Sequence, residues 1–188
     1  HTHSATCVMS GLAQLADLTS DAPLMARVKA FFDNGLWAMR DELGWVIESN
    51  VADSSPDRGE ANNTGDIVET ALILGRWGYA GCYQDTERIL RGHLLPSQLR
   101  DVSFIEDPPN PNNEDGLRDV ADRHLGAFGF PAPYGHQPVD VGDDPKYPDQ
   151  SLPVVSFNMD IVGGTVGTLC EVYRDTTRLD ATGHSVNL

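Results

Sequence analysis

Residues 58–77, RGEANNTGDIVETALILGRW, place four groups capable of chemistry at the start of an otherwise apolar helix pattern. They are the carboxylates Glu60 and Asp66 and the amides Asn62 and Asn63. Helix capping needs one or two polar residues at such a position. Four within seven positions indicate a site, in which Glu60 acts as an acid/base group, a metal ligand or a sugar-binding group beside the two amides.

Capping is the competing interpretation of the same residues. A carboxylate such as Glu60 is stabilised by the dipole at the start of a helix. Asp66 lies within the first predicted turn, where it is expected to act as a capping charge, and Asn62 or Thr64 is the expected N-cap residue. Both interpretations stay open at this point.

Two other predicted helices also follow polar residues. His1 and His3 precede the first helix, and with Glu60 they form a candidate ligand set for a divalent metal ion. Ordinary polar surface is the alternative for this histidine pair. Asn158 and Asp160 precede the last helix, where Asp160 is a second candidate catalytic carboxylate, Asn158 is a candidate sugar-binding amide, and capping is again the alternative.

A third carboxylate, Glu48, ends the short extended stretch WVIE at residues 45–48. It is a candidate general acid, because an apolar neighbourhood beside Trp45 would raise its pKa. A solvated charge at the end of a strand is the alternative. Aromatic faces also suit the C–H surfaces of sugar rings, and anchoring of the loop in a small local core competes with that role. The candidate stacking and binding side chains are Trp45, Phe128, Phe130, Tyr134 and His136.

Helical periodicity supplies the elements that must position these groups. Residues 4–18 and 64–78 are apolar nearly all round, as is typical of interior helices, with Val8, Leu12 and Leu15 as one stripe of the first. Each precedes an amphipathic outer helix, at about 22–40 and 83–95. A fifth helix, about 159–174, is again of the interior type. This alternation predicts an all-α fold of helical hairpins forming part of an (α/α)6 toroid.

In such a ring the interior helices run parallel, so we expect their polar amino ends to meet on one face. Residues 1–175 are predicted to be the C-terminal half of the toroid, with 101–155 as a long loop over the cleft and a short helix at 117–125. Residues 176–188 are predicted to begin a following β-sandwich. A complete ring needs about twelve helices of average length. We therefore expect this chain to be a piece of a longer protein, with an exposed apolar edge along its interior helices.

Charge excludes several classes of partner. The formal net charge is −15, and Lys29 and Lys146 are the two lysines, so a nucleic-acid partner is not expected. A membrane partner is not expected either, since no apolar run reaches the roughly 20 residues that a membrane helix needs. We expect a soluble protein, and its compartment is not indicated. Cys7, Cys82 and Cys170 have no metal-ligand spacing and are predicted to be small buried hydrophobic residues.

Residues 59–95, GEANNTGDIVETALILGRWGYAGCYQDTERILRGHLL, resemble the bacterial β-L-arabinofuranosidase family of six-hairpin toroid glycoside hydrolases. That family carries Glu-Thr-Cys-Ala at the head of the corresponding helix, and DTERILRGHLL at residues 85–95 resembles the end of its outer helix. GHSVNL at 183–188 resembles the strand by which the family enters its β-sandwich. The resemblance spans nearly the whole chain and implies the second half of the family's toroid.

The chain differs from the family at several of the family's functional positions. The glutamate that binds zinc in the family corresponds to Glu60, and its acid/base glutamate has a counterpart in Glu48. Asn62 stands where the family has a cysteine ligand, and Phe157 and Asn158 stand near its paired cysteines. Zinc held by thiolates and a cysteine nucleophile are therefore not expected here. The chain looks like a branch of the superfamily that depends on carboxylates or on another metal arrangement.

Three functions remain in competition. The first is a glycoside hydrolase acting on an oligo- or polysaccharide, with Glu48 as general acid and Glu60 or Asp160 as base, nucleophile or metal ligand. Carboxyl groups about 5–5.5 Å apart would indicate retention of configuration, and about 6.5–9.5 Å inversion. The second is a polysaccharide lyase with His3 or Tyr134 as base and an arginine opposite the uronate. The third is a non-catalytic carbohydrate-binding or structural toroid. The arginines available to a lyase are Arg58, Arg118 and Arg123.

Overall fold

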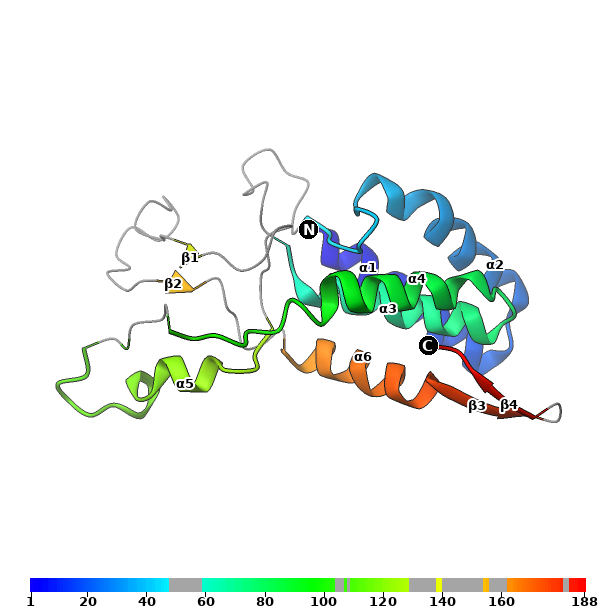
Figure 1. The fold of residues 1–188 in the computed structure, drawn as a ribbon. Helices are drawn as coiled ribbons and strands as arrows, with labels where there is room; N and C mark the ends of the chain where they lie inside the picture. Colours follow the sequence, from blue (N-terminus) through cyan, green and yellow to red (C-terminus); the bar gives the residue numbers. More distant parts are fainter. Residues whose placement is uncertain are drawn as a thin grey trace.

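The computed structural model of the chain describes residues 1–47, 59–103, 107, 109–128, 138–139, 154–155, 162–180 and 183–188. This part of the chain is mostly helical (Figure 1), which agrees with the predicted all-α class. Closure into a toroid stays a prediction. The principal helices are α1 (Thr2–Thr19), α2 (Ala22–Ala30), α3 (Ala61–Arg76), α4 (Gly81–Ile89), α5 (Val120–His124) and α6 (Val162–Asp175).

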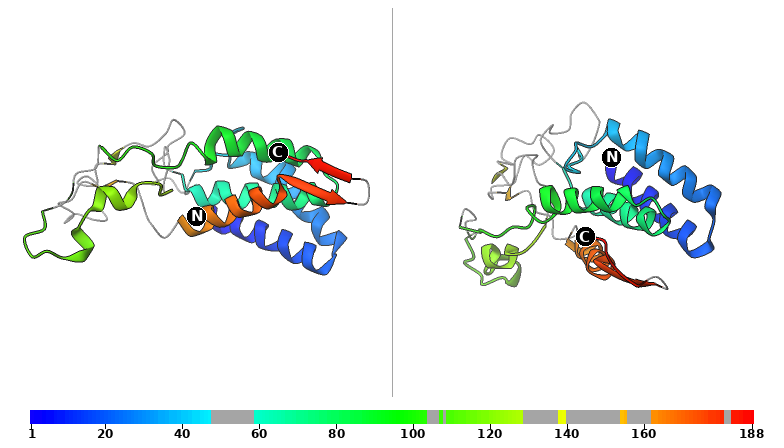
Figure 2. Two further views of the ribbon diagram at one scale, coloured as in Figure 1. Left: turned by 60° about the horizontal axis from the view of Figure 1, so that its bottom comes forward. Right: turned by 45° about the vertical axis from the view of Figure 1, so that its right-hand side comes forward.

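Helices α1, α3 and α6 lie in one row with α3 in the middle, and all three run in the same direction (Figures 1 and 2). Polar contacts follow this parallel register from end to end. Thr6 of α1 bonds to Asp66 near the start of α3, and Asp17 meets Arg76 near its end. Arg76 also meets Asp175 at the end of α6. The amino ends of the three interior helices are therefore on one side, as the sequence pattern predicted.

The first hairpin turns between residues 18 and 22, as expected, although α1 begins at Thr2, before the predicted start at residue 4. Ser20 ends α1 in the left-handed conformation (φ 55°), and Asp21 caps α2 by accepting a hydrogen bond from the Leu24 N–H at 2.9 Å. The outer helix that was predicted to reach residue 40 is interrupted. It continues as a π-helical turn, η1 (Phe31–Gly35), and a 3-10 turn, η2 (Leu36–Ala38). The second outer helix likewise ends in a π-helical turn, η3 (Leu90–Leu94).

The core surrounds α3. Its buried side chains form one cluster with buried residues of α1, α2 and α4. Phe31, at the start of η1, is 37% exposed. The amphipathic pattern predicted for residues 22–40 still buries Val28, Phe32 and Leu36, because α2 and η1 keep nearly continuous helical spacing. The largest core side chains are Met25, Phe32, Leu36, Ile67, Leu72, Ile73, Leu74, Ile89 and Leu94.

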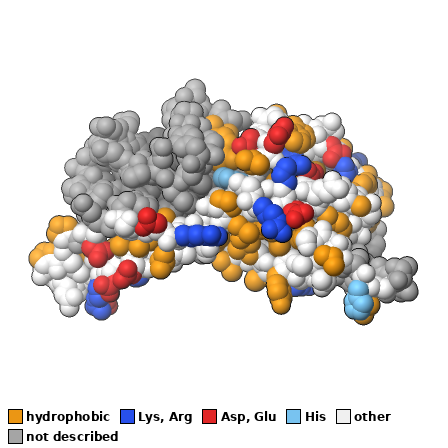
Figure 3. All heavy atoms as spheres, viewed as in Figure 1, with side chains coloured by type: hydrophobic (Ala, Val, Ile, Leu, Met, Phe, Trp, Pro, Cys, Tyr) orange, Lys and Arg blue, Asp and Glu red, His pale blue; other side chains and the backbone are white. Residues whose placement is uncertain are grey.

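The apolar stripe of α1 was predicted to be interior and is exposed in the structure. Val8 is 59% exposed, and Leu12 and Leu15 are exposed with it. The buried face of α1 instead carries mostly small or polar residues, including Thr6, Ala13 and Ala16, together with Met9. The small residues allow a close approach to α3. On the far side of the row, α6 exposes Val166 and Tyr173, and hydrophobic side chains gather where α6 runs in Figure 3. The predicted exposed apolar edge is thus present on both sides.

The prediction of buried cysteines is correct for Cys82 and wrong for Cys7 and Cys170. Cys7 lies beside the exposed stripe of α1, and Cys170 lies on the exposed side of α6. The predicted burial of these two cysteines is wrong for the same reason as the predicted burial of the α1 stripe. Both helices are edges of the row in the described structure, and an edge helix buries one face only.

Short antiparallel strand pairs complete the described fold. Strand β3 (Thr177–Asp180) pairs with β4 (Gly183–Val186), which lies within the predicted strand at residues 183–188. Strands β1 (Pro138–Val139) and β2 (Val154–Val155) pair inside the long connection between η3 and α6. The short helix expected at 117–125 is divided into a 3-10 turn, η4 (Asp115–Leu117), and α5. None of the described helices has the length and apolarity that crossing a membrane requires.

Candidate metal centre

His1, His3 and Glu60 come together where α1 and α3 begin. One ligand atom from each lies within 4.8 Å of the other two. The His1 Nε2 atom is 3.0 Å from Glu60 Oε1, and the His3 Nδ1 atom is 3.6 Å from Glu60 Oε2. The two imidazole rings meet edge to face with centroids 6.2 Å apart. Both carboxylate oxygens of Glu60 thus face a histidine.

Parallel packing of α1 and α3 is what brings these residues together. His1 is the residue before α1, and His3 lies in the first turn of that helix. Glu60 holds the equivalent place before α3, in extended backbone conformation (φ −111°, ψ 130°), and its side chain makes no capping hydrogen bond. The carboxylate is therefore directed sideways to α1 instead of along its own helix.

Gly59 fixes the backbone just before Glu60. It pairs with Ile47 in an isolated antiparallel bridge. A Cβ at this position would lie 2.5 Å from Trp45 Nε1 and 2.6 Å from the Val46 carbonyl oxygen, so the close approach requires glycine. The structure therefore places Trp45, a predicted sugar-binding residue, half-buried against the backbone that carries Glu60.

Asp66 adds a second carboxylate at the edge of the cluster. Its Oδ2 atom lies 3.6 Å from His3 Nε2 and accepts a hydrogen bond from Thr6 Oγ1 at 2.8 Å. Burial raises the pKa of Asp66 to about 6, and the Thr6 hydrogen bond and the nearby His3 oppose that rise. Asp66 is therefore part of the polar cluster, and the predicted capping role is wrong.

The predicted N-cap residues are also wrong, since Glu60 itself precedes the first helical residue. Helix α3 begins earlier than its apolar pattern because Ala61, Asn63, Thr64 and Gly65 are buried in spite of their small or polar side chains. Thr64 donates a hydrogen bond to the Gly44 carbonyl oxygen at 2.8 Å. The tertiary contacts of this first turn, and not its periodicity, determine where the helix starts.

The two candidate amides point to different partners. Asn63 is fully buried and lies toward α1, with its Oδ1 atom 3.3 Å from Thr6 Oγ1. Asn62 lies toward α6, because a Cβ on Gly164 would be 2.5 Å from its Oδ1 atom. Within the described residues the buried Asn62 Oδ1 atom has no hydrogen-bond partner. Asn63 therefore lies at the contact between α3 and α1, whereas Asn62 lies at the contact between α3 and α6.

The donor set fits a divalent transition metal ion. Two imidazole nitrogens and one carboxylate oxygen are ligands that zinc accepts, in the number found at catalytic zinc sites. Bonds of about 2.0–2.1 Å place the donors of a tetrahedral zinc site roughly 3.3 Å apart. The separations of 3.0 and 3.6 Å between the histidine nitrogens and the Glu60 oxygens lie on either side of that spacing.

The other predicted site residues lie outside the described part of the chain. They are Glu48, Phe130, Tyr134, His136, Asn158 and Asp160. The separation of the predicted catalytic carboxylates is therefore not defined. Phe128 is described and buried. Sequence reasoning did not assign Thr6 a role, although its position three residues after His3 places both on one face of α1.

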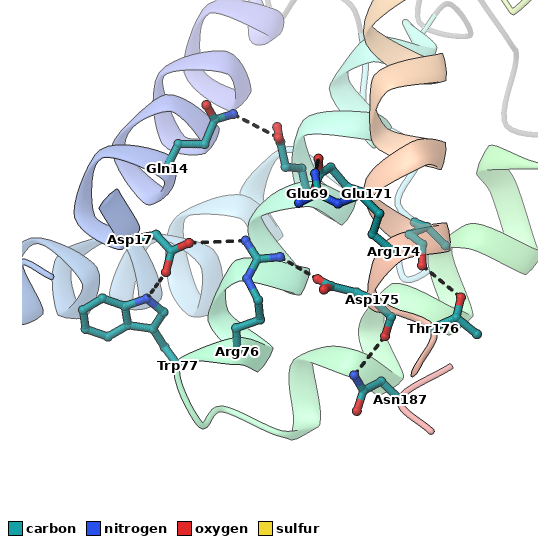
Figure 4. Close-up of polar contacts among 11 residues, drawn as sticks. Gln14, Asp17, Glu69, Arg76, Trp77, Glu171, Arg174, Asp175, Thr176 and Asn187 are labelled. Carbon is teal, nitrogen blue, oxygen red and sulfur yellow. Dashed lines mark hydrogen bonds and ion pairs between the residues drawn. The ribbon is translucent and has the colours of Figure 1, made fainter. Parts of the chain in front are cut away.

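A groove of about 210 Å³ opens at the other end of the helix row, between α1 and α6 (Figure 4). Arg76 lies in it and joins the three helices, with its guanidinium 3.4 Å from Asp17 and 2.5 Å from Asp175. The Trp77 indole N–H donates to Asp17 at 2.7 Å. These groups pair with one another, so this end of the row holds the helices together.

No protein-family model, no curated protein and no solved structure matches this chain.

Proposed function

We propose that His1, His3 and Glu60 bind a divalent metal ion, with zinc as the reference ion. The observation that carries the proposal is their convergence at the amino ends of two parallel helices, with Glu60 only 8% exposed. A buried carboxylate is stabilised by paired positive charge or by a metal ion. Imidazole and carboxylate donors together favour zinc, cobalt or nickel over magnesium and calcium, which prefer oxygen ligands alone.

We further propose that the metal site belongs to a carbohydrate-active enzyme of the glycoside hydrolase type. The support is the resemblance at residues 59–95, which puts Glu60 at the family's zinc-binding glutamate. In this proposal the imidazoles of His1 and His3 take the place of the family's thiolate ligands. With Glu60 on the metal, Glu48 and Asp160 are the carboxylates left for acid and base or nucleophile. A bound divalent ion would supply Lewis-acid polarisation of an oxygen or an activated water.

Zinc titration tests the metal proposal. The chain is freed of metal with a chelator and titrated with zinc by calorimetry, and we expect one ion per chain. Glu60→Gln should weaken zinc binding at least tenfold, since it removes the charged ligand. Matched controls are Glu87→Gln, at an exposed ion pair of α4, and His184→Ala, in β4, and both should bind as the unaltered chain does. Absence of stoichiometric binding to the unaltered chain would overturn the metal site.

Glycan turnover tests the enzymatic class in the longest natural form of the protein. Under the proposal, Glu48→Gln abolishes release of reducing ends from a responsive glycan, and chelation lowers it. Products with a 4,5-unsaturated bond, detected by ultraviolet absorbance, would identify a lyase instead. Binding of a glycan without turnover would identify the non-catalytic alternative.

A further inference from the structure

We propose that Asp66 is a positioning residue that holds the Nε2 side of His3 and so directs His3 Nδ1 to the metal. This inference rests on the metal site proposed above. The experiments below separate its failure from failure of the metal site itself.

His3 lies between two carboxylates with one ring nitrogen facing each. Its Nδ1 atom is 3.6 Å from Glu60 Oε2, on the side of the three-residue cluster, and its Nε2 atom is 3.6 Å from Asp66 Oδ2. A neutral imidazole carries one proton, and only the other nitrogen has a lone pair for a metal. A proton on Nε2 is attracted by Asp66 and leaves Nδ1 to bind beside Glu60.

Asp66 is itself held in place from α1. The Thr6 hydroxyl is fully buried and donates to the same Oδ2 atom that faces His3, at 2.8 Å. Longer approaches join that hydroxyl to Asn63 Oδ1 (3.3 Å) and to the His3 carbonyl oxygen (3.2 Å). Because a hydroxyl has one proton, the shorter contact with charged Asp66 is the favoured bond. Thr6 therefore fixes the carboxylate one helical turn from the histidine that it orients.

A carboxylate behind a metal-bound histidine sets the orientation and basicity of the ring, and its loss typically lowers metal affinity 10–100-fold. We therefore expect Asp66→Asn to weaken zinc binding 10–100-fold while the stoichiometry stays at one. The change keeps the size of the side chain and removes its charge. Zinc is titrated into the chelator-treated chain, and thermal unfolding confirms that the variant is folded.

Glu69→Gln is the matched control for a general weakening of the contact between α1 and α3. Glu69 lies one turn after Asp66 on α3 and also accepts hydrogen bonds from α1, from Ser10 at 2.5 Å and Gln14 at 3.0 Å. Both of these hydrogen bonds go to side chains of α1 other than those of His1 and His3. We expect unchanged zinc affinity in this variant. An equal loss in both variants, or no loss in Asp66→Asn while the unaltered chain binds zinc, would overturn the positioning role alone.

Nitrogen-15 NMR of the histidine rings gives a second measurement. The chemical shifts of the His3 ring nitrogens should change only if Asp66 acts on that ring, and not if Asp66 merely stabilises the fold. In the zinc-loaded chain, we expect His3 to carry its proton on Nε2 and the metal on Nδ1. Asp66→Asn should shift the Nε2 resonance, whereas Glu69→Gln should leave it in place. A zinc-loaded His3 with its proton on Nδ1 would contradict the inference even if the affinity data agreed with it.

Discussion

The Nε2 atom of His1 lies 3.0 Å from the Oε1 atom of Glu60. The two residues hold equivalent places, each directly before a helix of the parallel pair. A parallel pair of helices gathers its polar end groups without any local sequence motif. The site therefore depends on the packing of α1 against α3. A substitution that disturbs this packing is expected to weaken metal binding as well.

Zinc should stabilise the folded chain. A ligand that binds only the folded state at a free concentration one hundred times its Kd adds about 2.7 kcal/mol to the free energy of unfolding. For a chain of this size, that corresponds to a rise in Tm of roughly 5–10 °C. Scanning calorimetry with and without zinc measures the shift. Glu60→Gln should remove it, and a shift of equal size in that variant would place the ion elsewhere.

Gly59→Ala should disturb the site through the backbone. The added Cβ would lie within 2.6 Å of both Trp45 Nε1 and the Val46 carbonyl oxygen, so the segment carrying Glu60 must move. We expect zinc affinity to fall at least tenfold and the free energy of unfolding to fall by about 1–3 kcal/mol.

Gly11→Ala is the control for that substitution. Gly11 lies within α1, and a Cβ there meets nothing within 4 Å. Alanine should stabilise the helix by about 0.5–1 kcal/mol and leave zinc affinity unchanged. Urea unfolding of both variants provides the comparison. Equal changes in zinc affinity and in the free energy of unfolding for the two variants would contradict a role of the close approach of Gly59 to Trp45 in shaping the site.

Arg76→Met should weaken the opposite end of the helix row. The guanidinium joins Asp17 of α1 to Asp175 of α6 and is 27% exposed, so its loss leaves two carboxylates without their shared cation. We expect the free energy of unfolding to fall by about 1–3 kcal/mol. Arg91→Met provides the comparison, because its pair with Glu87 on α4 is exposed and should contribute less than about 1 kcal/mol. Chemical denaturation measures both, and equal losses would contradict the bridging role.

Two of the three cysteines should react readily in the folded chain. Cys7 and Cys170 are exposed, whereas Cys82 is buried, and burial raises its pKa from 9.0 to about 11 in spite of the opposing charge of Lys29. Alkylation at pH 8 followed by mass spectrometry should modify two thiols in the native chain and three in denaturant. Rapid modification of Cys82 in the native chain would contradict its burial.

The same shift makes stability depend on pH on the alkaline side. The unfolded thiol ionises near 9 and the folded one near 11, so the folded state binds more protons between these values. The Cys82 contribution to stability is therefore present below pH 9 and is lost as pH rises to 11. Cys82→Ala should unfold with a shallower dependence on pH in that range. Lys29, Arg40 and Asp85 also face this thiol and are unchanged in the comparison.

Periodicity predicted the helices well because burial of one face produces a regular spacing. It also predicted that Glu60 lies close to His1 and His3, because the amino ends of parallel helices lie on the same side. It failed for Val8 and its stripe on α1, where an apolar face is exposed in the described structure. An apolar helix face indicates that burial of that face is favourable, but it does not indicate which element packs on it.

The role of Asp66 was missed for a different reason. The sequence pattern placed Asp66 in the first turn of its helix, where the helix dipole explains a carboxylate locally. Its contacts with Thr6 and His3 come from another helix. Such contacts depend on the register between α1 and α3, which no local pattern specifies. The π-helical turn at Phe31–Gly35 was missed likewise, because its spacing differs little from that of an α-helix.

X-ray absorption at the zinc edge of the one-to-one zinc complex identifies the atoms that bind the ion at the proposed site of His1, His3 and Glu60. We expect nitrogen and oxygen neighbours at about 2.0–2.1 Å, with the multiple-scattering pattern of two imidazoles, and that pattern should be reduced in His3→Ala. Sulfur neighbours at about 2.3 Å, or a shell without imidazole, would contradict it.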